Sequence, residues 1–301
     1  MRRAVWSTLL LALLSVACTD YPKYVPFSTV DSDPDWSSDG RVIAFASTRE
    51  DGSTGIYVVR PDGRGLRRLF NGAASEVDWS PDGRRIAFVG ANGIYVIRTD
   101  VRRPRRILRG RQFSLPAWAP DGHRLAVVKD ERDLTTAIYV VRLDGRGLRR
   151  LLPPSLARSD PKWSTIAASE TEPTWSPDGR QIAFESGNGR IVAVRIADGS
   201  RRQIASEGFS PAWSPNGRLI AFQCGSAGAL CVANADGTGD IRQLASEGGD
   251  PSWAPGSRRV VFDVYHSRGH FRLQARSLSL VDVTGGGLRR VTYGPSPPAN
   301  P

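Results

Sequence analysis

A short segment that recurs six times organises this chain. In its fullest form, at residues 79–88, it is a tryptophan followed by Ser-Pro-Asp-Gly, two arginines and Ile-Ala-Phe. Proline presets φ for a tight turn, aspartate bonds to its own backbone, and glycine accepts a left-handed conformation. The segment therefore predicts a hairpin between two strands. The tryptophans that anchor the copies are Trp36, Trp79, Trp118, Trp175, Trp213 and Trp253.

The spacing of the copies predicts the architecture. Successive tryptophans are 43, 39, 57, 38 and 40 residues apart. A repeat of about 40 residues with four short strands is typical of a β-propeller. Each copy continues with a strand such as residues 56–59, an Asp-Gly turn such as Asp62-Gly63, and a fourth strand such as residues 66–69. Because one such sheet cannot bury its faces alone, we expect an all-β fold, a six-bladed β-propeller of four-stranded antiparallel blades at residues 33–294.

The complete pattern resembles the TolB-type propeller repeat. It reads Pro-x-Trp-Ser-Pro-Asp-Gly-Arg-x-Ile-Ala-Phe, then Ile-Tyr-Val, then Asp-Gly and Leu-Arg-Arg-Leu, with departures at Ser38, Asp100-Val101 and Gly256-Ser257. The resemblance implies a periplasmic, non-catalytic propeller that binds protein partners as an adaptor or scaffold. The protein that gives this repeat its name also carries a domain before its propeller. Only about 15 residues separate Cys18 from the first repeat here, so we expect that domain to be missing.

The N-terminus has the pattern of an export signal. Two arginines precede an apolar run at residues 5–17, which is shorter than the roughly 20 residues that span a bilayer. The run ends Leu-Ser-Val-Ala before Cys18, which resembles a bacterial lipoprotein signal; an ordinary secretory signal is the alternative. We therefore expect a signal peptide at residues 1–17, lipid on Cys18, and an exported, membrane-anchored periplasmic lipoprotein. Residues 18–32 would form a tether, part of which could instead add a strand that closes the ring.

The two remaining cysteines suit an exported protein. Cys224 ends one predicted strand and Cys231 begins the next, so the two side chains could meet across a hairpin at disulfide distance. Free buried thiols are the alternative, and export favours the disulfide. The loop that this bond would close is short, so its entropic stabilisation would be smaller than that of a long loop.

One interval between repeats is longer than the others and predicts an insertion at about residues 153–170. It contains a blade-like start at Trp163 that no turn and no Ile-Ala-Phe follow, so we interpret it as a loop. Long loops in compact domains are often functional. Trp163 is therefore a candidate contact for a glycan or small ligand, and packing against the rim is its alternative. Residues 295–301 are rich in proline and should form a disordered tail.

The basic charge of the chain, +11 with a pI of about 10.3, comes almost entirely from arginine. Many arginines fall in pairs on the predicted fourth strands, where basic side chains discourage edge-to-edge aggregation. The alternative is a basic girdle attracted to anionic lipid or acidic envelope polymers. We expect no nucleic-acid partner, because the export signal removes the chain from nucleic acid and no recognition module is present.

Equivalent positions of the repeats reveal a possible binding site. Four of the six residues that lie three positions before the repeat tryptophans are acidic. The six are Asp33, Glu76, Leu115, Glu172, Ser210 and Asp250. If the first strand of each blade is innermost, the carboxylates ring one mouth of the central channel. They could hold a cation or a basic segment of a partner; solvated loop carboxylates are the alternative.

Signatures of catalysis are weak in this sequence. The three histidines are His123, His266 and His270, and the last two lack the glutamate of a zinc-protease motif. No Gly-x-Ser-x-Gly nucleophile elbow occurs. We therefore expect a binding protein with no catalytic residues, cofactor or metal. The alternatives are a glycan-binding or small-ligand-binding propeller and, less favoured, the propeller part of a serine-peptidase-like or lyase enzyme.

Overall fold

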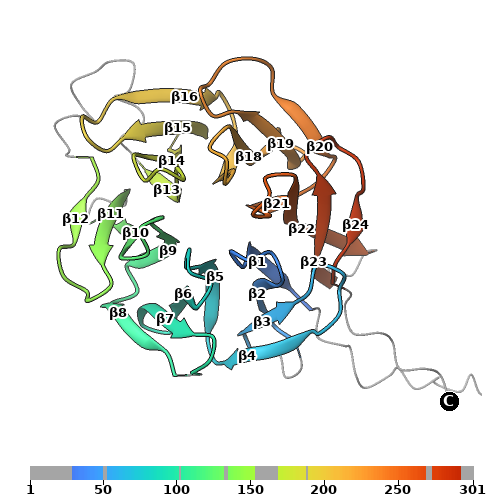
Figure 1. The fold of residues 1–301 in the computed structure, drawn as a ribbon, viewed down its shortest axis with the longest axis horizontal. Helices are drawn as coiled ribbons and strands as arrows, with labels where there is room; N and C mark the ends of the chain where they lie inside the picture. Colours follow the sequence, from blue (N-terminus) through green and yellow to red (C-terminus); the bar gives the residue numbers. More distant parts are fainter. Residues whose placement is uncertain are drawn as a thin grey trace, which may run out of the picture.

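A computed structural model describes residues 29–49, 53–101, 103–131, 135–152, 169–187, 189–268 and 273–292. These residues form 24 strands arranged in six four-stranded sheets around a central axis (Figure 1). The predicted all-β, six-bladed propeller is therefore confirmed. Within the described ranges, no helix is long and apolar enough to cross a membrane.

The blades follow one another along the chain, each built from four consecutive strands. Blade one comprises β1 (Asp31–Trp36), β2 (Ile43–Ser47), β3 (Gly55–Val59) and β4 (Arg67–Asn71), and blade two β5 (Ala74–Trp79), β6 (Arg85–Gly90), β7 (Gly93–Arg98) and β8 (Arg105–Arg109). Blade three comprises β9 (Phe113–Trp118), β10 (Arg124–Asp130), β11 (Thr136–Arg142) and β12 (Arg149–Arg150), and blade four β13 (Glu170–Trp175), β14 (Gln181–Ser186), β15 (Arg190–Arg195) and β16 (Arg201–Ala205). Blade five comprises β17 (Phe209–Trp213), β18 (Leu219–Cys224), β19 (Ala229–Asn234) and β20 (Arg242–Ala245), and blade six β21 (Gly249–Trp253), β22 (Arg259–Arg268), β23 (Leu273–Asp282) and β24 (Arg289–Arg290).

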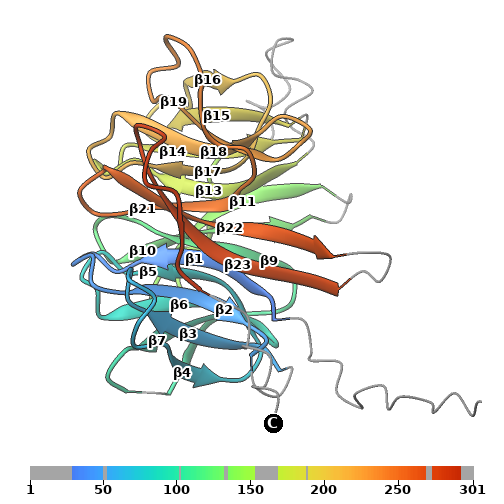
Figure 2. The same cartoon turned by 90° about the vertical axis from the view of Figure 1, so that its right-hand side faces the viewer.

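The up-and-down order of the strands gives the propeller two different faces. The turns between first and second strands, and between third and fourth strands, lie at one end of every blade; we call this the turn face. The hairpins between second and third strands, and the connections between blades, lie at the other end, the hairpin face. The long β22–β23 hairpin extends from the hairpin face (Figure 2).

Apolar side chains of neighbouring blades form the core. Between blades two and three, Ile94 and Leu108 pack against Trp118 and Leu125, and all four are buried. The second strands are buried along most of their length because the Ile-Ala-Phe side chains face blades on both sides. Five of the six repeats are closed by a glycine in the left-handed region. In blade six Ser257 takes that place with a φ of 55°, which explains how the departure from Asp-Gly is tolerated.

In the described residues, side-chain packing between blades one and six closes most of the ring. Trp36 and Phe45 of blade one contact Val261 and Leu278 of blade six. Upstream of β1, Val30 forms a parallel bridge to β23 of blade six, and its carbonyl also accepts the N–H of Thr48 at 3.2 Å.

A buried ion pair lies where the chain enters blade one. The Arg49 guanidinium donates to both carboxylate oxygens of Asp31, and the Ser47 hydroxyl donates to Asp31 at 2.6 Å. Since β1 begins at Asp31, blade one starts two residues inside the segment that we expected to be tether at residues 18–32.

The structure also tests the predicted disulfide and several predicted boundaries of strands and loops. A disulfide joins Cys224 to Cys231, with the two Cα atoms 5.9 Å apart. The expected fourth strand at residues 66–69 begins one residue later, at Arg67, and Leu66 is exposed ahead of it. Blade four begins at Glu170, inside the expected insertion. Residues 153–168 with Trp163, the signal peptide with Cys18, and the tail at 295–301 lie outside the described residues.

Candidate functional site: the central channel

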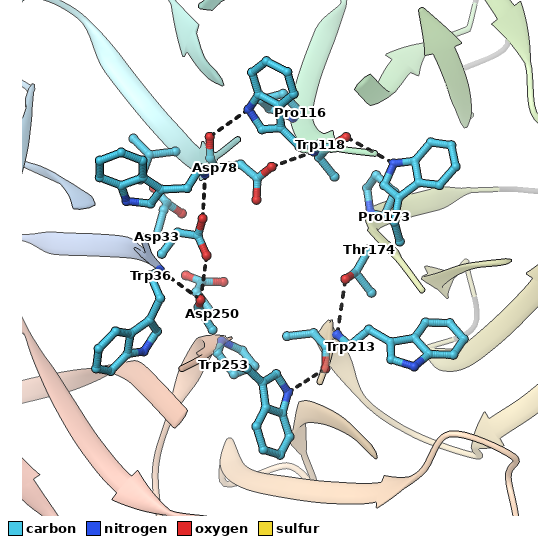
Figure 3. A pocket seen from close by; sticks show the side chains of 18 of the residues that line it. Asp33, Trp36, Asp78, Pro116, Trp118, Pro173, Thr174, Trp213, Asp250 and Trp253 are labelled. Carbon is cyan, nitrogen blue, oxygen red and sulfur yellow. Dashed lines mark hydrogen bonds between the residues drawn. The ribbon is translucent and has the colours of Figure 1, made fainter. Parts of the chain in front are cut away.

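The first strands of all six blades surround a channel along the propeller axis. Toward the turn face it opens into a cavity of about 490 Å³, which we call the upper cavity. The six repeat tryptophans radiate outward from its wall, and polar side chains point inward between them (Figure 3). Prolines of the first strands and of the turns complete the lining.

A second, lower cavity of about 560 Å³ opens toward the hairpin face between blades four, five and six. Glu172, Ser210 and Asp250 line both cavities and therefore lie at the level where the two meet. These are members of the set of six equivalent residues predicted from the repeats. We call that set the waist: Asp33, Glu76, Leu115, Glu172, Ser210 and Asp250.

The backbone of the waist has an unusual conformation in every blade. Each of its six residues has a positive φ, between 44° and 53°. The register of the first two strands shifts at this point, as it does between Ser32 and Asp35 in blade one. A non-glycine residue in the left-handed region costs about 1–3 kcal/mol and persists only where the surroundings determine it. Such residues concentrate at ligand-binding sites.

Hydrogen bonds between neighbouring blades hold the waist in place. The backbone N–H of Glu76 donates to Oδ2 of Asp33 at 3.0 Å, and the N–H of Leu115 donates to the Glu76 carboxylate. The N–H of Ser210 donates to the Glu172 carboxylate, and its hydroxyl donates to Asp250 at 2.9 Å. Each carboxylate thus ties its own blade to a neighbour while remaining on the channel wall.

A second layer of polar residues lies two positions farther along the first strands, and the repeat analysis missed it. Oδ2 of Asp35 accepts the N–H of Trp79 at 2.6 Å, and Oδ2 of Asp78 accepts the N–H of Trp118 at 2.6 Å (Figure 3). The hydroxyl of Thr174 accepts the N–H of Trp213 in the same way. The sequence signal was the same alternation that brings the waist residues inward, since residues two apart on a strand face one side.

Burial raises the pKa of most channel carboxyls. It raises the pKa of Asp33 and Asp35 to about 6, and the pKa of Glu76 and Glu172 to about 7. The negative charge of Asp250 adds to the effect at Asp33, Glu76 and Glu172. These carboxyls therefore face a common space that is poor in positive charge, and they gain protons near neutral pH.

The lower cavity combines charged and aromatic side chains. Arg276 donates to Asp263 at 2.7 Å and lies 3.7 Å from Asp250. Burial, followed by the charge of Asp250, raises the pKa of Asp263 to about 7 despite the guanidinium. Phe209 and Tyr265 line the same cavity and are 39% and 45% exposed. Aromatic rings left open to solvent beside polar groups are suited to hold a ligand.

The four predicted carboxylates do line one channel. They lie at its waist, however, and not at its mouth as expected. Asp33 is the third of six residues in β1, so it lies midway along the channel and not at the strand entrance. His123 lies in an exposed turn, outside both cavity linings. In the described part of the chain, no group of three or more His, Cys, Asp or Glu is placed to hold a metal ion.

Comparisons with known proteins match the chain to one family of β-propellers. A model of the TolB beta propeller domain family matches residues 93–294. The fold is similar to that of TolB from Acinetobacter baumannii, with a TM-score of 0.64 and 18% identity over 87% of this chain and 65% of that one. It is also similar to a putative TolB from Agrobacterium tumefaciens, with a TM-score of 0.53 and 21% identity over 87% of this chain and 80% of that one.

An enzyme shares the fold as well. An oligogalacturonate lyase from Vibrio parahaemolyticus matches with a TM-score of 0.58 and 14% identity, over 86% of this chain and 92% of that one. Likeness at these identities is one of fold and does not extend to activity. This chain spans 65% of the length of the A. baumannii protein.

Proposed function

This chain belongs to the TolB β-propeller domain family, and on that basis we propose that it is a non-catalytic protein-binding propeller of the bacterial cell envelope. In this proposal a lipid on Cys18 holds it at the membrane outside the cytoplasm. The channel receives a basic segment of a protein partner. The observation that carries the proposal is the carboxylate lining of the channel.

The lining is acidic in a chain whose net charge is +11. Glu76 and Glu172 meet negative neighbours there, and Arg276 is the single basic side chain that lines either cavity among the described residues. A lysine or arginine entering the channel would lower the pKa of these carboxyls and form charge-assisted hydrogen bonds with them. The channel therefore favours a cationic guest.

A peptide segment suits this channel better than a metal ion or a reacting substrate. The waist carboxylates accept backbone N–H groups of neighbouring blades, as Asp33 does from Glu76, which spreads them around the wall. Neither cavity is lined by a histidine or cysteine among the described residues. The aromatic rings of Phe209 and Tyr265 offer apolar contact at the lower opening, where a segment would enter.

The test is to isolate the tagged chain from its host envelope in mild detergent and identify what accompanies it. Replacing Glu76 and Glu172 together by glutamine keeps side-chain shape and removes two negative charges. We expect the variant to retain its partner at least about tenfold less well, because charge-assisted contacts contribute about 1.5–3 kcal/mol each. The control is Glu207→Gln with Asp240→Asn, which removes two charges from exposed positions outside both cavities.

A partner that stays with the Glu76→Gln/Glu172→Gln chain would refute the channel as its binding site. So would a partner lost equally from the control chain, because the effect would then follow net charge. A single protein lost only from the channel variant would support the proposal.

Glycan or small-ligand binding is the second candidate, and Phe209 and Tyr265 are the observation that favours it. Rings exposed beside Gln223 and Arg276 in a polar cavity are suited to stack on a sugar. The acidic lining would repel an anionic chain of the kind that the Vibrio lyase is named for, so a neutral or amino sugar would be the guest. A thermal shift with envelope sugars and divalent ions separates this candidate from the adaptor role, which predicts no shift.

A further inference from the structure

The exposed large hydrophobic side chains of the described residues fall into two groups. Two of them, Phe209 and Tyr265, line the lower cavity. The others all lie at the outer edge of the turn face, in the turn or the first residues that lead into a fourth strand. We call this group the apolar rim: Leu66, Val101, Leu148, Ile241 and Leu288.

Four of the five rim residues occupy equivalent positions. Leu66, Leu148, Ile241 and Leu288 each stand directly before the first residue of the fourth strand of their blade. The repeat of the blades therefore places them at one height around the molecule. These four residues are between 37% and 61% exposed. Solvent-exposed leucine or isoleucine at the same position in four blades is a property of the repeat and not a single accident.

Arginines accompany the rim residues in sequence and in space. Arg64 and Arg67 flank Leu66, and Arg146 and Arg149 flank Leu148, and all four are exposed. Asp144, in the turn before Leu148, is already paired with an arginine. Oδ1 of Asp144 accepts the N–H of Arg146, and its other oxygen lies 3.3 Å from Arg142. The rim is therefore apolar and basic together.

We propose that the turn-face rim docks on the surface of an anionic lipid bilayer. Aliphatic side chains partition into the headgroup region, and arginines are attracted to its negative charge. A soluble acidic polymer would bind the arginines, but it would make no apolar contact with Leu66 or Leu288. A folded protein partner would need a contiguous apolar patch, whereas these residues are spread around the circumference. A flat, fluid, negative surface is the partner that reaches all of them at once.

Docking in this way would set the orientation of the channel. The upper cavity opens on the turn face and would be turned toward the bilayer. The lower cavity, with Phe209 and Tyr265, opens on the hairpin face and would point away from it. The inference does not depend on lipid at Cys18, because the rim makes its own contact.

The test measures co-sedimentation of the full chain with vesicles of phosphatidylcholine and phosphatidylglycerol in a two-to-one ratio, and with vesicles of phosphatidylcholine alone. Any binding by the N-terminal region is common to all variants and appears on the neutral vesicles. The variant Leu66→Ser/Leu288→Ser removes two exposed rim side chains without touching the core. We expect it to bind the anionic vesicles about tenfold more weakly than the parent.

The matched control is Phe209→Ser/Tyr265→Ser, which removes the two exposed hydrophobic side chains of the opposite face. We expect it to bind the anionic vesicles as the parent does, and we expect raised salt to weaken binding by both parent and control. Equal binding by the parent and the Leu66→Ser/Leu288→Ser chain would overturn the proposal. So would an equal loss in both variants, or equal binding of the parent to neutral and anionic vesicles. Unchanged binding of the rim variant to soluble polyphosphate, with no vesicle binding by the parent, would assign the arginines to an acidic polymer instead.

Discussion

At the scale of single residues, the waist shows how position in the repeat decides the chemistry of a side chain. Asp33, Glu76 and Glu172 would be ordinary exposed carboxylates on an outer strand. On the innermost strand they lose water and face one another, so burial and mutual repulsion raise their pKa. Comparison of the repeats found these positions. It did not reveal the left-handed backbone there, because aspartate, glutamate, leucine and serine share no side-chain preference that would signal it.

The raised pKa values predict how stability depends on pH. Between about pH 4.5 and pH 7, Glu76 and Glu172 hold protons in the folded chain that they release on unfolding. The free energy of unfolding should therefore fall as pH rises through this window, by about 2–3 kcal/mol for each carboxyl. Replacing both by glutamine should flatten the dependence and leave the variant more stable than the parent at pH 8.

Urea unfolding at pH 5.5 and pH 8 checks this prediction. Glu207→Gln is the control, because Glu207 is exposed and lines neither cavity. A parent chain that becomes more stable between these pH values, or a glutamine variant with an unchanged slope, would contradict the account.

At the level of secondary structure, the sequence predicted the strands well, but it did not predict the cavity beside them. The Trp-Ser-Pro-Asp-Gly hairpins located the first two strands of each blade because turn chemistry and apolar strands coincide there. The lower cavity was missed. Its signal was a polar residue directly after the buried phenylalanine of two second strands, Gln223 and Asp263, where blades one and two have Ala46 and Val89. A polar residue in an otherwise buried strand marks an opening beside it.

The turn between third and fourth strands makes a further contact between blades. The turn glycine of one blade lies against a backbone carbonyl of the preceding blade: an added Cβ would stand 2.7 Å from the oxygen of Val291 at Gly63, and 2.7 Å from that of Ile107 at Gly145. At Gly63 this contact joins blade one to the end of blade six. It therefore belongs to ring closure.

Gly63→Ala and Gly285→Ala separate this contact from backbone strain. Both glycines have left-handed φ values, 83° and 85°, so alanine costs each about 1 kcal/mol. Nothing lies within 4 Å of an added Cβ at Gly285. Gly63→Ala should therefore destabilise the chain by about 1–3 kcal/mol more than Gly285→Ala, as measured by urea unfolding. Equal losses would mean that the turn does not hold the ring closed.

In the whole molecule, basic and acidic side chains lie in different places, although the net charge of the chain sums them. Arginine pairs lie on the outer fourth strands, such as Arg105-Arg106 on β8, whereas carboxylates line the first strands at the axis. The net charge of +11 therefore describes the outside and not the channel. A reading of composition alone would assign the chain an acidic ligand. In our proposals, the order of strands from axis to rim gives the channel a basic ligand and the rim an anionic surface.

Photo-crosslinking in the host cell through Phe209 tests directly whether the channel binds a protein partner. A benzoyl-phenylalanine at this position keeps an aromatic ring at the opening of the lower cavity, and Gln203, exposed on the outer strand β16, is the control position. We predict one dominant protein adduct from position 209, attached beside a lysine or arginine of the partner, and its loss when Glu76 and Glu172 are replaced by glutamine. Absence of a protein adduct at position 209, or the same adducts from position 203, would contradict a channel that binds a protein partner.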